Sequence, residues 1–150
     1  ASNANGFGRT ASAVANFEHR VNISTGGTVD LVTDLILNAA TNGGTHTSAF
    51  ELQGGTLDFG ANDYDFTNLD TTNAANGIIF ENIASTITLD GDRVADVNSW
   101  ILAGALSTNV GTFNVSFDGA DTLVAVPEPS SAVAVLGLAG AGLVLFRRRR

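Results

Sequence analysis

The chain of 150 residues is long enough for one ordinary domain and an appendage, and its charge is divided unevenly between the two. Residues 1–125 carry 14 acidic side chains and three arginines, a net charge of −11, whereas residues 126–150 carry one glutamate and four arginines, a net charge of +3. The acidic body has no lysine and would repel phosphate groups, so we expect no nucleic-acid partner. The absence of cysteine excludes a disulfide framework and a thiolate metal site.

Residues 1–125 have the pattern of a β-rich body, because Gly, Asn, Thr and Asp are frequent and favour turns over helix interiors. Apolar and polar residues alternate in four segments, which predicts strands buried on one side: 17–23, 56–59, 86–90 and 113–117. Three runs are apolar throughout, which predicts strands covered on both faces: 35–37, 78–80 and 100–102. A helix over residues 29–40 is the alternative there, but Val29, Val32 and Thr33 are β-branched and favour a strand.

Turn signals about every 8–12 residues indicate a sandwich, a barrel or a solenoid. Gly-Gly-Thr occurs three times, at residues 26–28, 43–45 and 54–56, and similar turns could stack at one corner of successive coils. We therefore expect an all-β body that is a β-solenoid of roughly five coils of ~20–25 residues. A two-sheet β-sandwich is the alternative.

The body also resembles surface proteins built from autotransporter-associated β-strand repeats. The segments that carry this resemblance are Leu-Gln-Gly-Gly-Thr-Leu-Asp-Phe at residues 52–59 and Ser-Thr-Ile-Thr-Leu-Asp-Gly at residues 85–91. The resemblance implies a right-handed parallel β-helix, of which this chain would hold the last coils.

The last 25 residues predict a membrane segment. Two prolines within residues 126–130 stop any strand or helix, and residues 131–146 contain no charge. As a helix these 16 residues would span roughly 24 Å, a little less than the ~30 Å of a bilayer core. The four arginines Arg147, Arg148, Arg149 and Arg150 would hold the C-terminus on the cytoplasmic side. A buried hairpin or core helix is the alternative.

This arrangement resembles the PEP-CTERM sorting signal of Gram-negative bacteria, and its motif residues here are Val126, Pro127, Glu128 and Pro129. The resemblance implies export by the general secretory route and processing near the motif by exosortase, a membrane-embedded protease. It further implies an inner-membrane-anchored precursor, delivery to the cell surface or extracellular matrix, and an association with exopolysaccharide and biofilm. Position 1 is alanine, so we expect a processed or N-terminally truncated chain with a signal peptide upstream.

The body offers few residues for chemistry, and we expect no cofactor. Calcium is the most plausible ligand, because Asp-rich turns supply hard oxygen atoms, with Asp63, Asp65, Asp90 and Asp92 as weak candidates. Neither His19 nor His46 has metal-ligand spacing. The aromatic side chains of Tyr64 and Trp100 could stack on sugar rings if exposed, although Trp100 fits a core position better.

These observations predict an exported structural or adhesive surface protein without enzymatic activity. Its partners would be exosortase, the membrane before processing, and exopolysaccharide. The alternative is a carbohydrate-binding module, or a fragment of a polysaccharide-active enzyme whose catalytic part lies upstream of Ala1. Binding of a soluble polysaccharide that depends on Tyr64 or Trp100 would favour the alternative.

Overall fold

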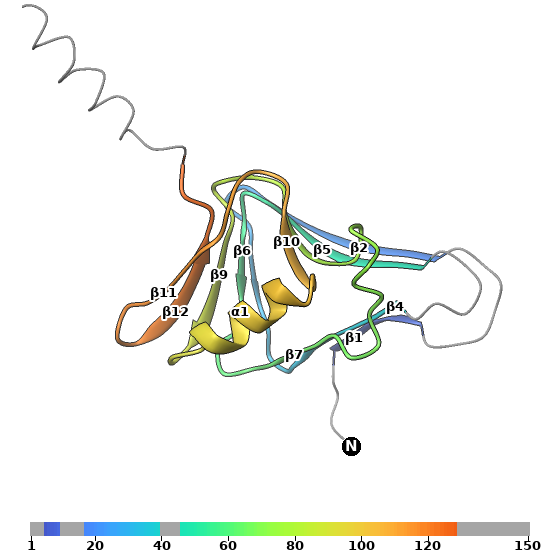
Figure 1. Ribbon diagram of the computed structural model, residues 1–150, viewed down its shortest axis with the longest axis horizontal. Helices are drawn as coiled ribbons and strands as arrows, with labels where there is room; N and C mark the ends of the chain where they lie inside the picture. Colours follow the sequence, from blue (N-terminus) through green and yellow to red (C-terminus); the bar gives the residue numbers. More distant parts are fainter. Residues whose placement is uncertain (1–4, 10–16, 40–45, 129–150) are drawn as a thin grey trace, which may run out of the picture.

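The computed structural model describes residues 5–9, 17–39 and 46–128, which form three β-sheets and one helix around a shared core (Figure 1). The three-stranded sheet has the order β1 (Asn5–Arg9), β4 (Leu35–Ala39), β7 (Tyr64–Asp65). The four-stranded sheet has the order β10 (Leu106–Thr108), β8 (Gly77–Phe80), β5 (His46–Gln53), β2 (Phe17–Ser24). The five-stranded sheet has the order β11 (Asn114–Phe117), β12 (Asp121–Ala125), β9 (Thr86–Asp90), β6 (Thr56–Asp58), β3 (Thr28–Asp30).

The prediction of a β-solenoid with a right-handed parallel β-helix is wrong, because the strands form three open sheets of mixed topology. Most neighbours pair in parallel, but β11, β12 and β9 pair antiparallel in the five-stranded sheet. A helix, α1 (Val94–Leu102), follows β9 where the chain has no further strand of the three-stranded sheet. The β-sandwich alternative fails as well, since the described strands make three sheets.

The Gly-Gly-Thr triplets misled the prediction because their spacing is not the spacing of the paired strands. Thr28 pairs with Thr56 and Thr56 with Thr86, so neighbouring strands are 28 and 30 residues apart in sequence. The first and third triplets do lead into the adjacent strands β3 and β6. The second triplet, at residues 43–45, lies outside the described residues.

The core is built from the inward side chains of all three sheets. Strand β8 is buried along its whole length, and Leu35, Leu57 and Leu106 contribute one fully buried leucine from each sheet. Helix α1 covers the edge of β7, because Trp100 packs against Tyr64 with ring centroids 5.4 Å apart in an edge-to-face arrangement. A covered edge cannot pair with another chain, so the helix protects that side of the sheet.

Six of the seven predicted strand segments are strands. The alternation at 86–90 is confirmed in β9, where Ile87 and Leu89 are buried and the residues between them are half-buried. The segment 29–40 holds β3 and β4, as the β-branched residues indicated. The strand predicted at 100–102 is wrong, because Trp100, Ile101 and Leu102 are the last residues of α1.

The predicted membrane helix at residues 131–146 lies outside the described residues, as do the four terminal arginines. Within the described ranges, no helix has both the length and the apolar character that a bilayer crossing requires. Strand β12 is the last described element, and residues 126–128 follow it in an irregular conformation.

Candidate functional site

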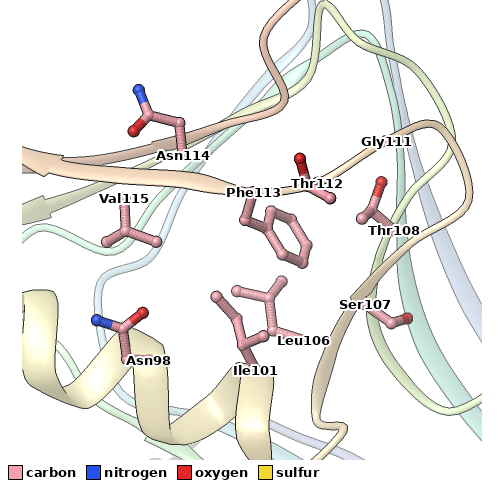
Figure 2. A pocket seen from close by; sticks show the side chains of 10 residues that line it. All are labelled: Asn98, Ile101, Leu106, Ser107, Thr108, Gly111, Thr112, Phe113, Asn114 and Val115. Carbon is pink, nitrogen blue, oxygen red and sulfur yellow. The ribbon is translucent and has the colours of Figure 1, made fainter.

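A groove of about 640 Å³ lies between helix α1 and the segment that contains β10 and β11; it is called the α1–β11 groove below. Its volume falls within the roughly 300–1,000 Å³ of small-molecule sites. Figure 2 shows side chains from the helix and from β11 facing one another across it. Its apolar part comprises Ile101, Leu106, Phe113 and Val115.

The polar part of the α1–β11 groove consists of neutral side chains. Amides and hydroxyls come from the helix, from β10, from the connection between β10 and β11, and from β11 itself: Asn98, Ser107, Thr108, Thr112 and Asn114. Thr108 is already used by the fold, since its hydroxyl oxygen accepts a hydrogen bond from the backbone N–H of Val110 at 3.2 Å. The groove therefore offers apolar contact and uncharged hydrogen-bonding groups.

Tyr64 and Trp100 are core residues, 6% and 5% exposed, so neither is available to stack on a ligand. Both rings join Phe59 and Phe66 in an aromatic cluster. The Tyr64 hydroxyl donates a hydrogen bond to the carbonyl oxygen of Ala105 at 3.1 Å, and burial raises the pKa of this phenol above its usual range. The ring most available to a ligand is Phe113, which is half-buried beside the groove.

The calcium candidates Asp63 and Asp65 flank Tyr64 and both have partners in the fold. Asp63 forms an ion pair with Arg93, and the Asp63 carboxylate is mostly exposed. Hydrogen bonds from the side chain and backbone of Thr67 lower the pKa of the Asp65 carboxyl. Both carboxylates therefore have a structural use at the start of β7 and just after it.

The candidates Asp90 and Asp92 lie after β9, on the turn that leads into α1. Asp90 stands opposite Asp121 of β12, and the Asp92 carboxylate accepts a long hydrogen bond from the backbone N–H of Val94 at 3.4 Å. Across the part of the chain that the structure describes, no three His, Asp or Glu side chains come together as a possible metal site. The two acidic pairs are therefore not joined into one cluster.

The two histidines lie on neighbouring strands, His19 in β2 and His46 in β5. His19 is exposed and stands opposite Ser48, whereas the side chain of His46 lies outside the described residues. The structure thus gives His19 the surface position that its sequence environment indicated.

The last strand leads directly into the predicted sorting segment. Strand β12 lies between β11 and β9, so it is an internal strand, and it ends at Ala125. Val126 is still part of the core, at 3% exposed, whereas Pro127 and Glu128 are exposed. The described body therefore ends at Val126, with no spacer before the first proline.

Val126 is held by the same loop that lines the α1–β11 groove. A Cβ atom built on Gly111 would lie 2.7 Å from Val126 Cγ1, well inside the 3.5–4.0 Å of normal carbon contacts. Only a glycine leaves room for Val126 at this position. The connection between β10 and β11 thus packs directly on the last core residue before the tail.

The tail can now be compared with known proteins. Residues 125–150 match the PEP-CTERM protein-sorting motif. A comparison with curated proteins and with solved structures finds no match to the chain. The resemblance of the body to autotransporter-associated β-strand repeats therefore has no support from a homologue.

The PEP-CTERM motif implies an exported protein that exosortase processes, which agrees with the prediction from the tail. The matched region begins at Ala125, the last residue of β12, so it overlaps the folded body by two residues. Pro127 and Glu128 are exposed at the junction, whereas Pro129 and Arg147–Arg150 of the PEP-CTERM motif lie outside the described residues. The cytoplasmic orientation of the arginines stays a prediction.

The α1–β11 groove was missed in the sequence because its residues come from one helix, two strands and the loop between them. One signal for the helix was present. Val94, Val97 and Ile101 recur at helical spacing, and Gly104, at φ 77°, follows the helix end as helix-terminating glycines do. That pattern would have placed Asn98 and Ile101 on one helix.

Proposed function

We propose that this chain is an exported bacterial surface protein whose body has a structural or adhesive role in the cell envelope or the polysaccharide matrix. In this proposal the body acts by contact and has no catalytic activity. The PEP-CTERM tail directs the precursor to the membrane and to exosortase, after which the body reaches the surface.

The observation that carries the proposal is the sharp boundary after Val126. Every residue of the hydrophobic core lies at or before Val126, and the exposed Pro127 and Glu128 follow at once. Removal of the tail beyond the motif would therefore take away no core side chain. A body that stays folded after this removal is suited to a lasting role outside the cell.

The surface of the body is consistent with such a role. Residues 1–125 have a net charge of −11, which favours solubility and disfavours binding to other anionic surfaces. The carboxylates nearest to the aromatic cluster, Asp63 and Asp65, are engaged by Arg93 and Thr67. These contacts support a structural reading of residues that could otherwise suggest an acid–base pair.

The proposal is tested by fractionating cells of the producing bacterium with and without exosortase activity. We expect the body in the surface or matrix fraction of normal cells, and a larger membrane-bound precursor when exosortase is absent. Glu128→Ala should also accumulate precursor. Glu18→Ala is the matched control, because it removes an exposed glutamate whose ion pair with Arg20 should matter little to stability.

Two results would contradict the proposal. A body that stays in the cytoplasm in normal cells would remove the surface role. A processed body that is fully shed into the medium, with none held by envelope or matrix, would leave the protein exported but not structural or adhesive.

A carbohydrate-binding module is the second candidate, and the α1–β11 groove is the observation that favours it. The earlier candidates for sugar contact, Tyr64 and Trp100, are buried and cannot take this role. Any such function must use other residues.

A further inference from the structure

We propose that the α1–β11 groove is a binding site for a neutral saccharide. This inference deepens the proposed function, since a surface protein held in a polysaccharide matrix needs a place where the polymer binds. It rests on the lining of the groove, whereas the proposed surface role rests on the tail and its junction with the body.

The apolar part of the groove suits the C–H faces of a sugar ring. Ile101, Phe113 and Val115 are half-buried, so each leaves part of its side chain accessible beside the groove. The Phe113 ring is fixed from behind by an edge-to-face contact with Phe80, with centroids 5.1 Å apart. A ring held in this way presents a rigid apolar surface at little cost in conformational entropy.

The polar part suits the hydroxyl groups of a sugar. Asn98 is exposed on α1, and its amide makes no hydrogen bond within the described residues. Thr112 is likewise exposed on the opposite side, with a hydroxyl that the described fold does not use. Amides and hydroxyls both donate and accept hydrogen bonds, as sugar hydroxyls do, so the two sets can pair in either direction.

The charge of the groove selects for a neutral ligand. None of the residues that line it is ionisable, although the body around it carries 14 acidic side chains. An anionic polymer would meet the repulsion of the whole body, and a cationic ligand would find no carboxylate in the groove. An uncharged saccharide avoids both penalties.

An extended apolar peptide is the competing occupant, because β11 is an edge strand of its sheet and could accept another strand. Such a peptide would place apolar side chains against the neutral polar groups Asn98 and Thr112 and leave them without partners. The mixed lining therefore favours the saccharide.

The test is a titration of the full chain, kept in a detergent without a sugar headgroup, with the neutral glucan oligosaccharides cellohexaose and laminarihexaose. Binding is followed by isothermal calorimetry and by the NMR shifts of backbone amides. We expect binding of at least one glucan at millimolar concentration or better, with the largest shifts at Asn98, Gly111 and Phe113. Asn98→Ala and Thr112→Ala should each weaken it by about 2- to 10-fold, the range of one hydrogen bond.

Asn68→Ala is the matched control, because Asn68 is an exposed asparagine outside the groove and its loss should leave the affinity unchanged. Phe113→Leu keeps an apolar side chain against Phe80 but removes the ring, and should weaken binding more than either polar variant. All variants are compared at equal thermal stability or corrected for its loss.

Three outcomes would overturn the inference: no binding of either glucan, binding that is insensitive to the Asn98 and Thr112 variants, or preferential binding of an apolar β-strand peptide to β11. Any of them leaves the surface role standing, because that role is measured by cell fractionation. Conversely, glucan binding by a protein that never reaches the surface would refute only the surface role.

Discussion

Gly111 and Val126 meet where the body joins the sorting motif, since a methyl group on Gly111 would lie 2.7 Å from Val126 Cγ1. This contact ties the loop beside the α1–β11 groove to the last core residue of the chain. Val126 therefore belongs to the body by its packing and to the PEP-CTERM region by its sequence.

Gly111→Ala should destabilise the body by about 1–3 kcal/mol, the usual cost of adding a methyl group to a packed site. Its new side chain must push Val126 out of place or shift the loop. Urea unfolding of the purified chain measures the change, and Thr112→Ala, the adjacent exposed position, should show little effect.

A double-mutant cycle separates this contact from a general loss of packing. Val126→Ala alone should also destabilise the chain, because it empties part of a buried site. Combined with Gly111→Ala it gives the new methyl group room, so the two losses should sum to more than the loss in the double variant. Strict additivity would show that the two residues do not interact.

Thr122→Val should cost about 1–3 kcal/mol although it barely changes the side chain's volume. The buried Thr122 hydroxyl accepts a hydrogen bond from the Arg93 N–H and donates one to the Gly91 carbonyl oxygen, both at 2.7 Å. Valine leaves both backbone groups unpaired. Hydrogen exchange of the Arg93 amide should accelerate, and an unchanged exchange rate at this amide would count against the predicted role.

The Tyr64 phenol should stay protonated in the folded chain at pH values where an exposed tyrosine ionises, because burial raises its pKa. A raised folded pKa means stability is fully present below the unfolded pKa of about 10 and is lost as pH rises above it. The chain has one tyrosine, so its tyrosinate absorbance reports this group alone.

Absorbance and circular dichroism should therefore change together on alkaline titration, as the chain unfolds. Tyr64→Phe should remove the absorbance change and reduce the loss of stability above about pH 10. A tyrosinate signal near pH 10 in a chain that stays folded would contradict the buried position.

The turn between β11 and β12 should weaken in acid. Hydrogen bonds from the backbone N–H groups of Asp121 and Ala120, both at 2.9 Å, lower the pKa of the Asp118 carboxyl. Stability from a lowered pKa is present above the unfolded value of about 3.9 and is lost as pH falls through the folded value.

Asp118→Asn keeps an acceptor oxygen but not the charge, so wild type should be the more stable chain near neutral pH and the two should converge in acid. Unfolding midpoints at about pH 6 and about pH 2.5 measure this. A difference that stays constant between these two pH values would mean that the charge of Asp118 does not stabilise the turn.

The strands were largely predictable from local pattern, because a half-buried strand needs alternation and nothing more. Ile87 and Leu89 alternate with Thr86 and Thr88, and the structure places the first two in the core. The way strands are shared among sheets was not predictable in the same manner. Partners such as Thr28 and Thr56 are 28 residues apart, and no local pattern records that distance.

Helix α1 was taken for a strand because its strongest apolar run is only three residues long, and a run that short is compatible with either structure. Its start is also weakly marked, since Arg93 stands at the N-cap and makes no side-chain capping hydrogen bond. The sorting tail was found because its three parts are contiguous in the sequence, and a family comparison confirms the PEP-CTERM motif.

The central claim is that the body is complete at Val126 and that the tail after it is a removable sorting signal. Intact-mass measurement of the mature protein, taken from the envelope and medium of the producing bacterium, tests it most directly. We predict a C-terminus within residues 126–130, with Val126 retained and residues 131–150 gone. A mature chain that still ends at Arg150, or one cut before Val126 within β12, would contradict the account.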